Sequence, residues 1–192
     1  EFPELRDLIT RTLVSIDSRS LLAYGDPSGD ISLRVLIARN LGLETGMESS
    51  VVITSGGQHA LCLSLSSALE SRSIFLVQQP CFFGAIRAVH SWHKTVRLVP
   101  FSDPSQLPQL IRSNPRCVVY ITSNHNPEGS PCSITSSEKE LIAKEAFQNG
   151  SIVIEDNPYD VTMFDDSFAD ERSTIFSISV ARGWSEAVIF IG

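Results

Sequence analysis

Apolar and polar positions along the chain follow two patterns. Short runs rich in β-branched residues are apolar almost throughout, which is typical of strands buried on both faces of a parallel sheet. Between most of these runs, apolar residues recur three or four positions apart, which is the spacing of one helix face. The predicted strands are 51–54, 74–77, 95–99, 117–122, 152–155 and 188–191, and the clearest predicted helices are 31–41, 58–69 and 136–149.

The alternation of strands and helices predicts an α/β fold, with a mostly parallel sheet and helices on both of its faces. The 192 residues suit one such domain. We expect a helical segment over 1–23, followed by the domain itself over 24–192. The stretch 100–108, rich in Pro, Ser and Asp, is interpreted as a loop, and the irregular stretch between Tyr159 and Val188 as a long surface excursion.

Composition excludes several classes of function. The chain has 15 Lys and Arg against 22 Asp and Glu, a formal charge of −7, which argues against a nucleic-acid-binding surface. We expect neither a membrane span nor a secretory signal, because no apolar run is long enough and the first residues lack a basic region. The cysteines lack the spacing of a zinc site, so we expect reduced thiols and a cytoplasmic location. They are Cys62, Cys81, Cys117 and Cys132.

Ligands of such sheets bind beyond the carboxyl ends of the strands. After the strand at 51–54, the turn Ser55-Gly56-Gly57-Gln58 leads into a helix, and a glycine turn at a helix N-terminus favours an anion such as phosphate. Turns of this kind are also common in α/β proteins where they bind nothing. After the strand at 74–77, Phe82 and Phe83 offer a ring face for stacking, unless both rings belong to the core.

Two further strand ends carry polar chemistry. Asn126-Pro127-Glu128-Gly129 specifies a turn that would hold Asn126 as a hydrogen-bond donor to a ligand, or would be a turn and nothing more. Glu155 and Asp156 end a strand and need partners there. A carboxylate at this point suits a protonated ring nitrogen, with Tyr159 near a ring oxygen, although a simple capping acid would also fit. Together these groups are the set that pyridoxal 5′-phosphate needs.

Four segments give the chain a resemblance to a known family. Residues 24–34 are similar to a Y-x-x-P-x-G-x-x-x-L-R opening, 52–61 to a phosphate-binding turn, 126–129 to N-P-T-G and 155–159 to E-D-D-P-Y. From about Tyr24 to Gly192, the chain resembles the large domain of fold-type-I pyridoxal-phosphate-dependent aminotransferases of class I/II. The branch is that of aminoadipate and kynurenine aminotransferases and of the effector domains of MocR-type regulators.

The resemblance implies contacts with the cofactor ring. Phe82 would stack on the pyridine ring, where the family often has Tyr, and Asp156 would pair with the ring nitrogen. Asn126 and Tyr159 would contact the ring hydroxyl oxygen. The protonated ring would then act as an electron sink.

The resemblance also implies contacts with the cofactor phosphate. Gly57 and Gln58 would bind it through their backbone amides. Tyr24 would reach the phosphate of the neighbouring subunit, because the family builds its sites across a homodimer. His59 stands where the family often has Gln, and its role is left open.

One feature departs from the family. The family forms a Schiff base through a lysine in an S-x-S-K or T-F-S-K segment, and none of Lys94, Lys139 and Lys144 stands in such a segment. Residues 187–192 are similar to the V-I-Y-L-G strand that precedes T-F-S-K. An alternative alignment places 177–180 on the motif, with Val180 in place of the lysine. We therefore expect a partial chain without the lysine and the small domain, which is not competent alone.

The expected activity is amino transfer between an amino acid and a 2-oxo acid. A pyridoxal-phosphate-dependent lyase or cyclase acting on an amino-acid-derived substrate would use the same groups, as would a non-catalytic effector-binding module. An unrelated nucleotide-binding protein is disfavoured because the sequence has no G-x-G-x-x-G and no phosphate-loop lysine. We expect small-molecule substrates and no nucleic-acid or membrane partner.

Overall fold

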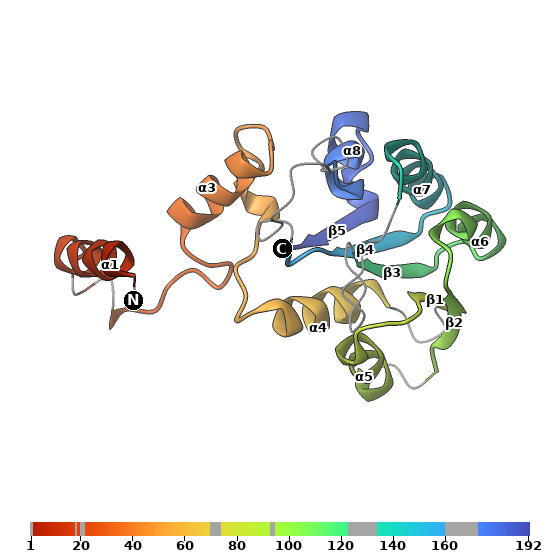
Figure 1. The fold of residues 1–192 in the computed structure, drawn as a ribbon, viewed down its shortest axis with the longest axis horizontal. Helices are drawn as coiled ribbons and strands as arrows, with labels where there is room; N and C mark the ends of the chain where they lie inside the picture. Colours follow the sequence, from red (N-terminus) through yellow and green to blue (C-terminus); the bar gives the residue numbers. More distant parts are fainter. Residues whose placement is uncertain are drawn as a thin grey trace. The chain divides into compact units, whose positions relative to one another are not determined.

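The centre of the fold is a parallel sheet of five strands in the order β2-β1-β3-β4-β5 (Figure 1). This computed structural model describes residues 2–17, 19, 22–69, 74–92, 95–122, 134–159 and 173–192. The strands are β1 (Ile74–Gln78), β2 (Arg97–Phe101), β3 (Val118–Thr122), β4 (Ile152–Asp156) and β5 (Val188–Ile191).

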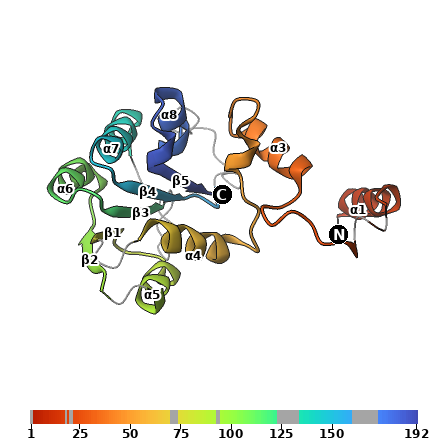
Figure 2. The same cartoon turned by 180° about the vertical axis from the view of Figure 1, so that it is seen from behind.

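Helices cover both faces of this sheet, as the sequence predicts (Figures 1 and 2). One face carries α4 (Gly57–Ala68) and α5 (Phe83–Trp92). The other carries α6 (Leu107–Ser113), α7 (Ser136–Gln148) and α8 (Ile175–Arg182), with the short 3-10 turns η2 (Pro104–Gln106) and η5 (Ser185–Ala187). Among the helices of the described ranges, none combines the length and the apolar character that a bilayer crossing requires.

The two faces of the sheet form two separate cores. Successive side chains of a strand point to opposite faces, so every second residue joins the same core. In β3, Val118 and Tyr120 join the core under α4 and α5, whereas Val119 and Ile121 join the core under α6, α7 and α8. A strand between two helical layers is therefore buried on both sides, which explains its unbroken apolar pattern.

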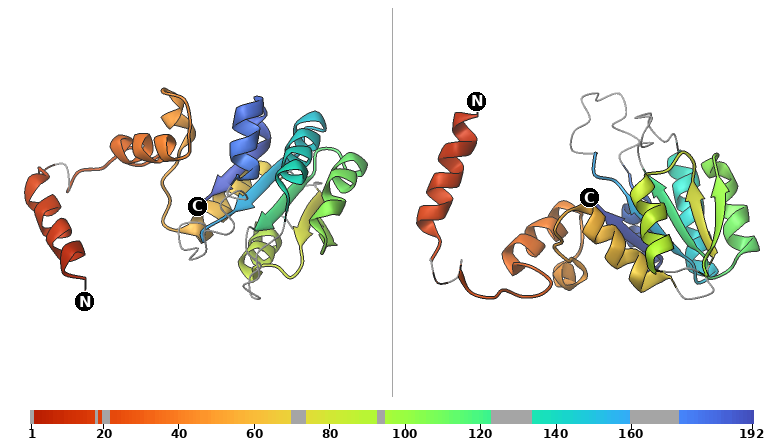
Figure 3. Two further views of the ribbon diagram at one scale, coloured as in Figure 1. Left: turned by 45° about the horizontal axis from the view of Figure 1, so that its top comes forward. Right: turned by 90° about the horizontal axis from the view of Figure 1, so that it is seen from below.

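The carboxyl ends of the parallel strands lie along one edge of the sheet (Figure 3). Thr122 at the end of β3 is in register with Asp156 at the end of β4, and Asp156 with Ile191 of β5. The Gln78 side chain links the ends of β1 and β3, because its Oε1 accepts a hydrogen bond from the backbone N–H of Thr122 at 3.2 Å. The ends of α4 and α5 that lie at this edge are their N-termini, because each helix runs antiparallel to the strand that neighbours it in sequence.

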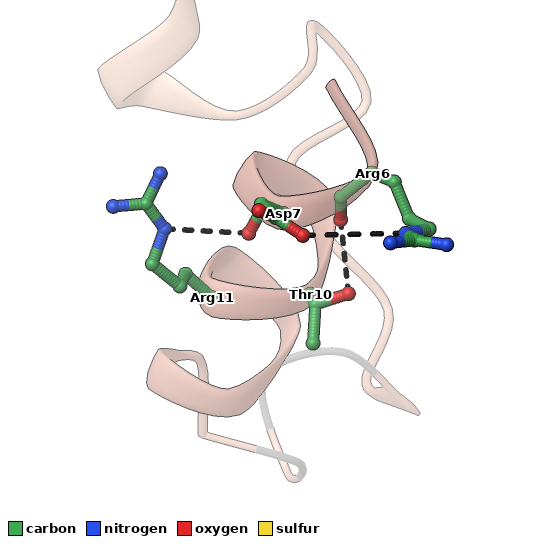
Figure 4. Close-up of polar contacts among 4 residues, drawn as sticks. All are labelled: Arg6, Asp7, Thr10 and Arg11. Atoms are coloured by element: carbon green, nitrogen blue, oxygen red, sulfur yellow. Dashed lines mark hydrogen bonds and ion pairs between the residues drawn. The ribbon is translucent and has the colours of Figure 1, made fainter. Parts of the chain in front are cut away.

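Residues 1–53 form a second compact unit. It contains α1 (Pro3–Ser15), α3 (Ile31–Asn40) and the 3-10 turn η1 (Met47–Ser50). None of the α1 residues is buried. The polar side of α1 is linked by local contacts (Figure 4): Arg6 pairs with Asp7, Thr10 Oγ1 donates to the Arg6 carbonyl at 2.9 Å, and Arg11 Nε donates to the Asp7 carbonyl at 3.3 Å.

The turn that precedes α3 is closely packed. Asp26 accepts a hydrogen bond from the Ser28 N–H at 2.7 Å, and Asp30 caps α3 by accepting from the Leu33 N–H at 3.0 Å. Gly29 has a φ of 98°, and a Cβ at this position would collide with the Ile53 side chain. The glycine of the Y-x-x-P-x-G segment is therefore required by both backbone conformation and space.

Three sequence predictions about elements are wrong. Residues 51–54 are not a strand in the structure, and within the described part of the chain their backbone makes a single ladder-like contact, from the Ile53 N–H to the Ser28 carbonyl at 2.9 Å. The interpreted loop at 100–108 contains the end of β2, η2 and the start of α6. The interpreted excursion before Val188 includes α8. The division of the chain at residues 23 and 24 stays a prediction.

Candidate functional site

The glycine turn opens α4 at the carboxyl edge. Gly56 precedes the helix with a φ of 92°, a left-handed conformation that glycine adopts without strain. No side chain of the described residues caps the helix, and both Gly57 and Gln58 are exposed. The first backbone N–H groups of a helix have no intrahelical acceptor, and the helix dipole is positive at this end. The turn therefore offers backbone donors and a favourable field to an anion.

His59 holds this turn in shape. Its Nδ1 accepts a hydrogen bond from the backbone N–H of Ser55 at 3.1 Å, and Thr54 Oγ1 donates to the Gly56 carbonyl at 3.2 Å. Because Nδ1 is an acceptor here, the neutral imidazole carries its proton on Nε2. The role that the sequence left open for His59 is thus a local one, to close the turn that leads into α4.

The aromatic pair lies after β1. The ring centroids of Phe82 and Phe83 are 5.1 Å apart with an interplanar angle of 58°. Phe82 is half-buried against the core under α4 and α5, whereas 71% of Phe83 is exposed. The interpretation that both rings are core residues is therefore wrong for Phe83.

Gly84 brings the glycine turn and the aromatic pair together. A Cβ at Gly84 would collide with the Gln58 Oε1 atom and with the ring edge of Phe82. Both side chains therefore lie directly against the first turn of α5. Residues from the start of α4 and from the segment that leads from β1 into α5 thus meet at the same place on the carboxyl edge.

The two acids that end β4 have different roles, because neighbouring residues of a strand point to opposite faces. Glu155, which is 5% exposed, accepts hydrogen bonds from the backbone N–H groups of Ile175 and Phe176, both at 2.9 Å. It therefore caps the N-terminus of α8, so the capping-acid interpretation holds for Glu155. Asp156 points to the α4–α5 face, where its Oδ2 accepts a hydrogen bond from the Tyr120 hydroxyl at 2.7 Å.

The electrostatics of this cluster single out Asp156. Burial raises the pKa of the Asp156 carboxyl, and the hydrogen bond from Tyr120 opposes that rise. Burial and the neighbouring Asp156 hold the pKa of the Tyr120 phenol far above its ordinary value. The same two causes raise the pKa of the Cys81 thiol to about 12. Tyr120 and Cys81 therefore keep their protons at neutral pH, and of these three groups the Asp156 carboxyl is the one that can carry charge.

The structure brings most of the predicted residues of this edge into one neighbourhood. Cys81 interacts with Asp156, and its neighbour Phe82 lies with Gln58 against Gly84. Tyr159, three residues beyond Asp156, interacts electrostatically with Tyr120. The acid and the glycine turn are thus on the same edge and the same face of the sheet.

The structure leaves the predicted contacts of two further residues untested. Asn126 lies outside the described residues. Tyr24 belongs to the unit of residues 1–53, where its side chain is fully exposed. The contacts expected of both residues stay predictions.

Tyr120 and Cys81 were not predicted from the sequence as members of this cluster. A phenol inside a strand that is otherwise apolar and buried needs a hydrogen-bond partner, and this requirement was a usable signal for Tyr120. Cys81 had no such signal, because a cysteine is as common in a core as in a site.

The lysines of α7 lie on the other face of the sheet. The Lys139 Nζ donates to the Ser173 carbonyl at 2.8 Å, and Lys144 is exposed. The buried residues of α7 join the core opposite to Asp156. Lys94 lies outside the described residues. The strand predicted at 188–191 is confirmed as β5, whereas the alternative alignment places its motif inside α8.

A parallel sheet between helical layers, with an uncapped helix start and an acid at its carboxyl edge, defines an α/β protein with a candidate ligand site at that edge. The sequence model of the family "Aminotransferase class I and II" matches residues 2–186. The chain belongs to this family. The predicted family is thereby confirmed, and family membership supports pyridoxal 5′-phosphate as the cofactor.

Individual relatives cover most of the chain. A 2-aminoadipate transaminase of Thermus thermophilus is 27% identical over 176 residues, which are 89% of this chain and 42% of that protein. An uncharacterized HTH-type transcriptional regulator of Bacillus subtilis, YhdI, is 33% identical over 144 residues, 73% of this chain and 30% of that protein. The chain therefore spans less than half the length of these curated relatives.

Solved structures show the same fold. An α-aminoadipate aminotransferase of Thermus thermophilus, complexed with N-(5′-phosphopyridoxyl)-L-leucine, superposes with a TM-score of 0.72 at 22% identity, over 88% of this chain and 42% of that one. An aspartate aminotransferase tetra mutant of Thermus thermophilus gives 0.73 at 18% identity, over 96% and 49%. The predicted fold class is thus confirmed.

Proposed function

We propose that this chain forms the cofactor-binding part of a pyridoxal-phosphate-dependent aminotransferase, which transfers an amino group between an amino acid and a 2-oxo acid. The observation that carries the proposal is the meeting of the glycine turn, Phe82 and the Asp156 carboxylate at one edge of the sheet. The proposed protein is a cytoplasmic homodimer. The family membership of the chain supports the same reaction class.

The residues of this edge fit the cofactor chemically. Backbone N–H groups of Gly57 and Gln58 would bind the phosphate, because they stand at an uncapped helix N-terminus. The ring of Phe82 would pack on the heterocycle, and Tyr159 and Asn126 would donate to its hydroxyl oxygen. Tyr24 would bind the phosphate held by the neighbouring subunit.

Asp156 would hold a proton on the ring nitrogen. An ionised carboxylate beside that nitrogen favours its protonated form, and the interaction is stronger in a partly buried site than in water. Bound pyridoxal 5′-phosphate supplies an electron sink, and its capacity depends on this proton. The amine that carries out the transfer would come from a lysine outside these 192 residues.

The phosphate contact can be tested with one substitution. Proline is tolerated at the first position of a helix but has no N–H, so Gly57→Pro removes the proposed donor and keeps α4. Loss of one hydrogen bond to a charged group should weaken binding of pyridoxamine 5′-phosphate about ten- to a hundredfold, measured by fluorescence titration. Gly57→Ala is the matched control, because a Cβ at Gly57 meets no atom within 4 Å and the N–H remains. Equal weakening by both variants, or by neither, would refute the phosphate contact.

A second candidate function is an effector-binding module with the same cofactor site. Three relatives, 29–33% identical, are named HTH-type transcriptional regulators. A lyase or cyclase is a third use of the same groups. Conversion of the bound aldehyde form of the cofactor into its amine form by an amino acid, followed in the complete protein by absorbance, separates the candidates. A transaminase regenerates the aldehyde form with a 2-oxo acid, whereas a binding module does not turn over.

A further inference from the structure

The Tyr120 side chain is fixed in the core beneath the candidate site. It is 0% exposed, and its ring centroid lies 6.4 Å from that of Phe75 on β1. Tyr120 is in register with Ile154, which precedes Asp156 by two residues on the same face of β4. A long side chain reaches such a diagonal neighbour. The hydroxyl thus arrives at Asp156 from a neighbouring strand whose position is set by the sheet.

The bond between these residues has a defined direction. The phenol keeps its proton, since burial and the Asp156 charge both oppose its ionisation, so Tyr120 donates and Asp156 Oδ2 accepts. A hydrogen bond donated to a carboxylate stabilises its charged form, whereas burial stabilises the neutral form. Among the described residues, the other groups that interact with the pair are Cys81, which stays a neutral thiol, and Tyr159. Neither supplies a positive charge.

We propose that Tyr120 is a positioning residue for Asp156: its hydroxyl holds Oδ2, keeps the carboxylate ionised and leaves Oδ1 as the oxygen available to a protonated ring nitrogen. This inference rests on the proposed function, because a ring nitrogen is the partner that gives the arrangement a purpose. Tyr120 itself does not touch the cofactor in this proposal. It acts through Asp156, by affecting the charge and the orientation of the Asp156 carboxylate.

The coupling can be measured without any cofactor. Tyr120→Phe removes one oxygen and keeps the ring that packs near Phe75, so we expect the variant to fold. The titration of the Asp156 carboxyl is followed by carbon-13 NMR, and Asp156→Asn identifies its signal. The midpoint should rise by at least about one pH unit in Tyr120→Phe, because burial then acts unopposed.

A matched control removes another buried hydroxyl next to the same strand. Ser151 is 2% exposed, directly precedes β4 at its opposite end and accepts a hydrogen bond from the Cys117 N–H at 3.1 Å. Ser151→Ala should leave the Asp156 midpoint unchanged. An unchanged or lower midpoint in Tyr120→Phe would overturn the proposed role of Tyr120.

A second measurement links the role to the ring nitrogen. The probe is pyridoxamine 5′-phosphate labelled with nitrogen-15 in the ring, whose chemical shift reports ring protonation. At a pH between the Asp156 midpoints of the two proteins, the ring should be more protonated in the wild type than in Tyr120→Phe, because the wild type then offers it an ionised partner. Failure of the wild type to bind the probe would count against the proposed function, and the cofactor-free titration would still decide the role of Tyr120.

Discussion

Glu155 connects the candidate site to the helical layer behind it, and its removal should have a large effect on stability. The carboxylate is 5% exposed and accepts two backbone hydrogen bonds of 2.9 Å at the start of α8. Glu155→Gln keeps the size of the side chain, but the amide group offers one acceptor oxygen and places an NH2 against the second N–H. One bond to a charged acceptor is lost and the other becomes neutral.

The magnitude follows from these two changes. A hydrogen bond to a charged group contributes about 1.5–3 kcal/mol, and neutralising the second bond and its interaction with the helix dipole costs about 1 kcal/mol more. We expect the free energy of unfolding to fall by about 3 kcal/mol. The free energy of unfolding falls by about 2 kcal/mol for each molar increase in urea concentration, so the urea midpoint of unfolding should fall by about 1.5 M.

The same substitution at an exposed cap provides the control. Glu138 accepts a hydrogen bond from the Thr135 N–H at 2.9 Å in the capping box of α7, but this bond is exposed to solvent and the residue is only half-buried. Glu138→Gln should cost about 0.5 kcal/mol, because water replaces the lost interaction. Urea unfolding followed by circular dichroism measures both variants, and hydrogen exchange of the Ile175 and Phe176 amides should accelerate in Glu155→Gln. Equal midpoints for the two variants would refute the reasoning from burial.

Two predictions concern the groups around Asp156. Because the pKa of the Cys81 thiol is raised to about 12, its thiolate fraction at pH 8 is about a thousandfold below that of an ordinary thiol. Alkylation of Cys81 by iodoacetamide in the folded protein should be slowed to a similar degree, because the thiolate is the reactive form. A Cys81 that reacts as fast in the folded as in the urea-unfolded chain would contradict this, as mass spectrometry of the labelled peptide would reveal. Because burial raises the pKa of the folded-state Asp156 above its unfolded value, the stability that this group contributes is complete below the unfolded pKa and is lost as the pH rises through the folded pKa. Asp156→Asn should therefore be more stable than the wild type at pH 7, with the difference in urea midpoint closing near pH 3, and a difference independent of pH would exclude this cause.

The residue types and their spacing predicted part of the candidate site. The sequence pointed to Gly57 and Gln58 as a candidate anion turn because a glycine turn at a helix N-terminus presents backbone N–H groups that have no intrahelical acceptor. It pointed to two acids at the end of a strand because charges there need partners. It did not divide their roles, and that division follows from the alternation of side chains about β4: Glu155 faces α8 and Asp156 faces Tyr120.

The chain by itself determined the elements whose signals are local. Strands β1, β3, β4 and β5 and helices α3, α4 and α7 lie within about two residues of their predictions, because hydrophobic periodicity and capping residues are read along a continuous segment. Residues 51–54 have the same apolar pattern as the true strands, but no strand of the described residues lies beside them to complete their hydrogen bonds. Helix α8 is short, and Glu155 from another element accepts hydrogen bonds from its first N–H groups. Tertiary structure alone decided these cases and the pairing of Tyr120 with Asp156, since hydrogen-bond partners that are 20 to 36 positions apart in the chain are chosen by strand order and register rather than by local sequence.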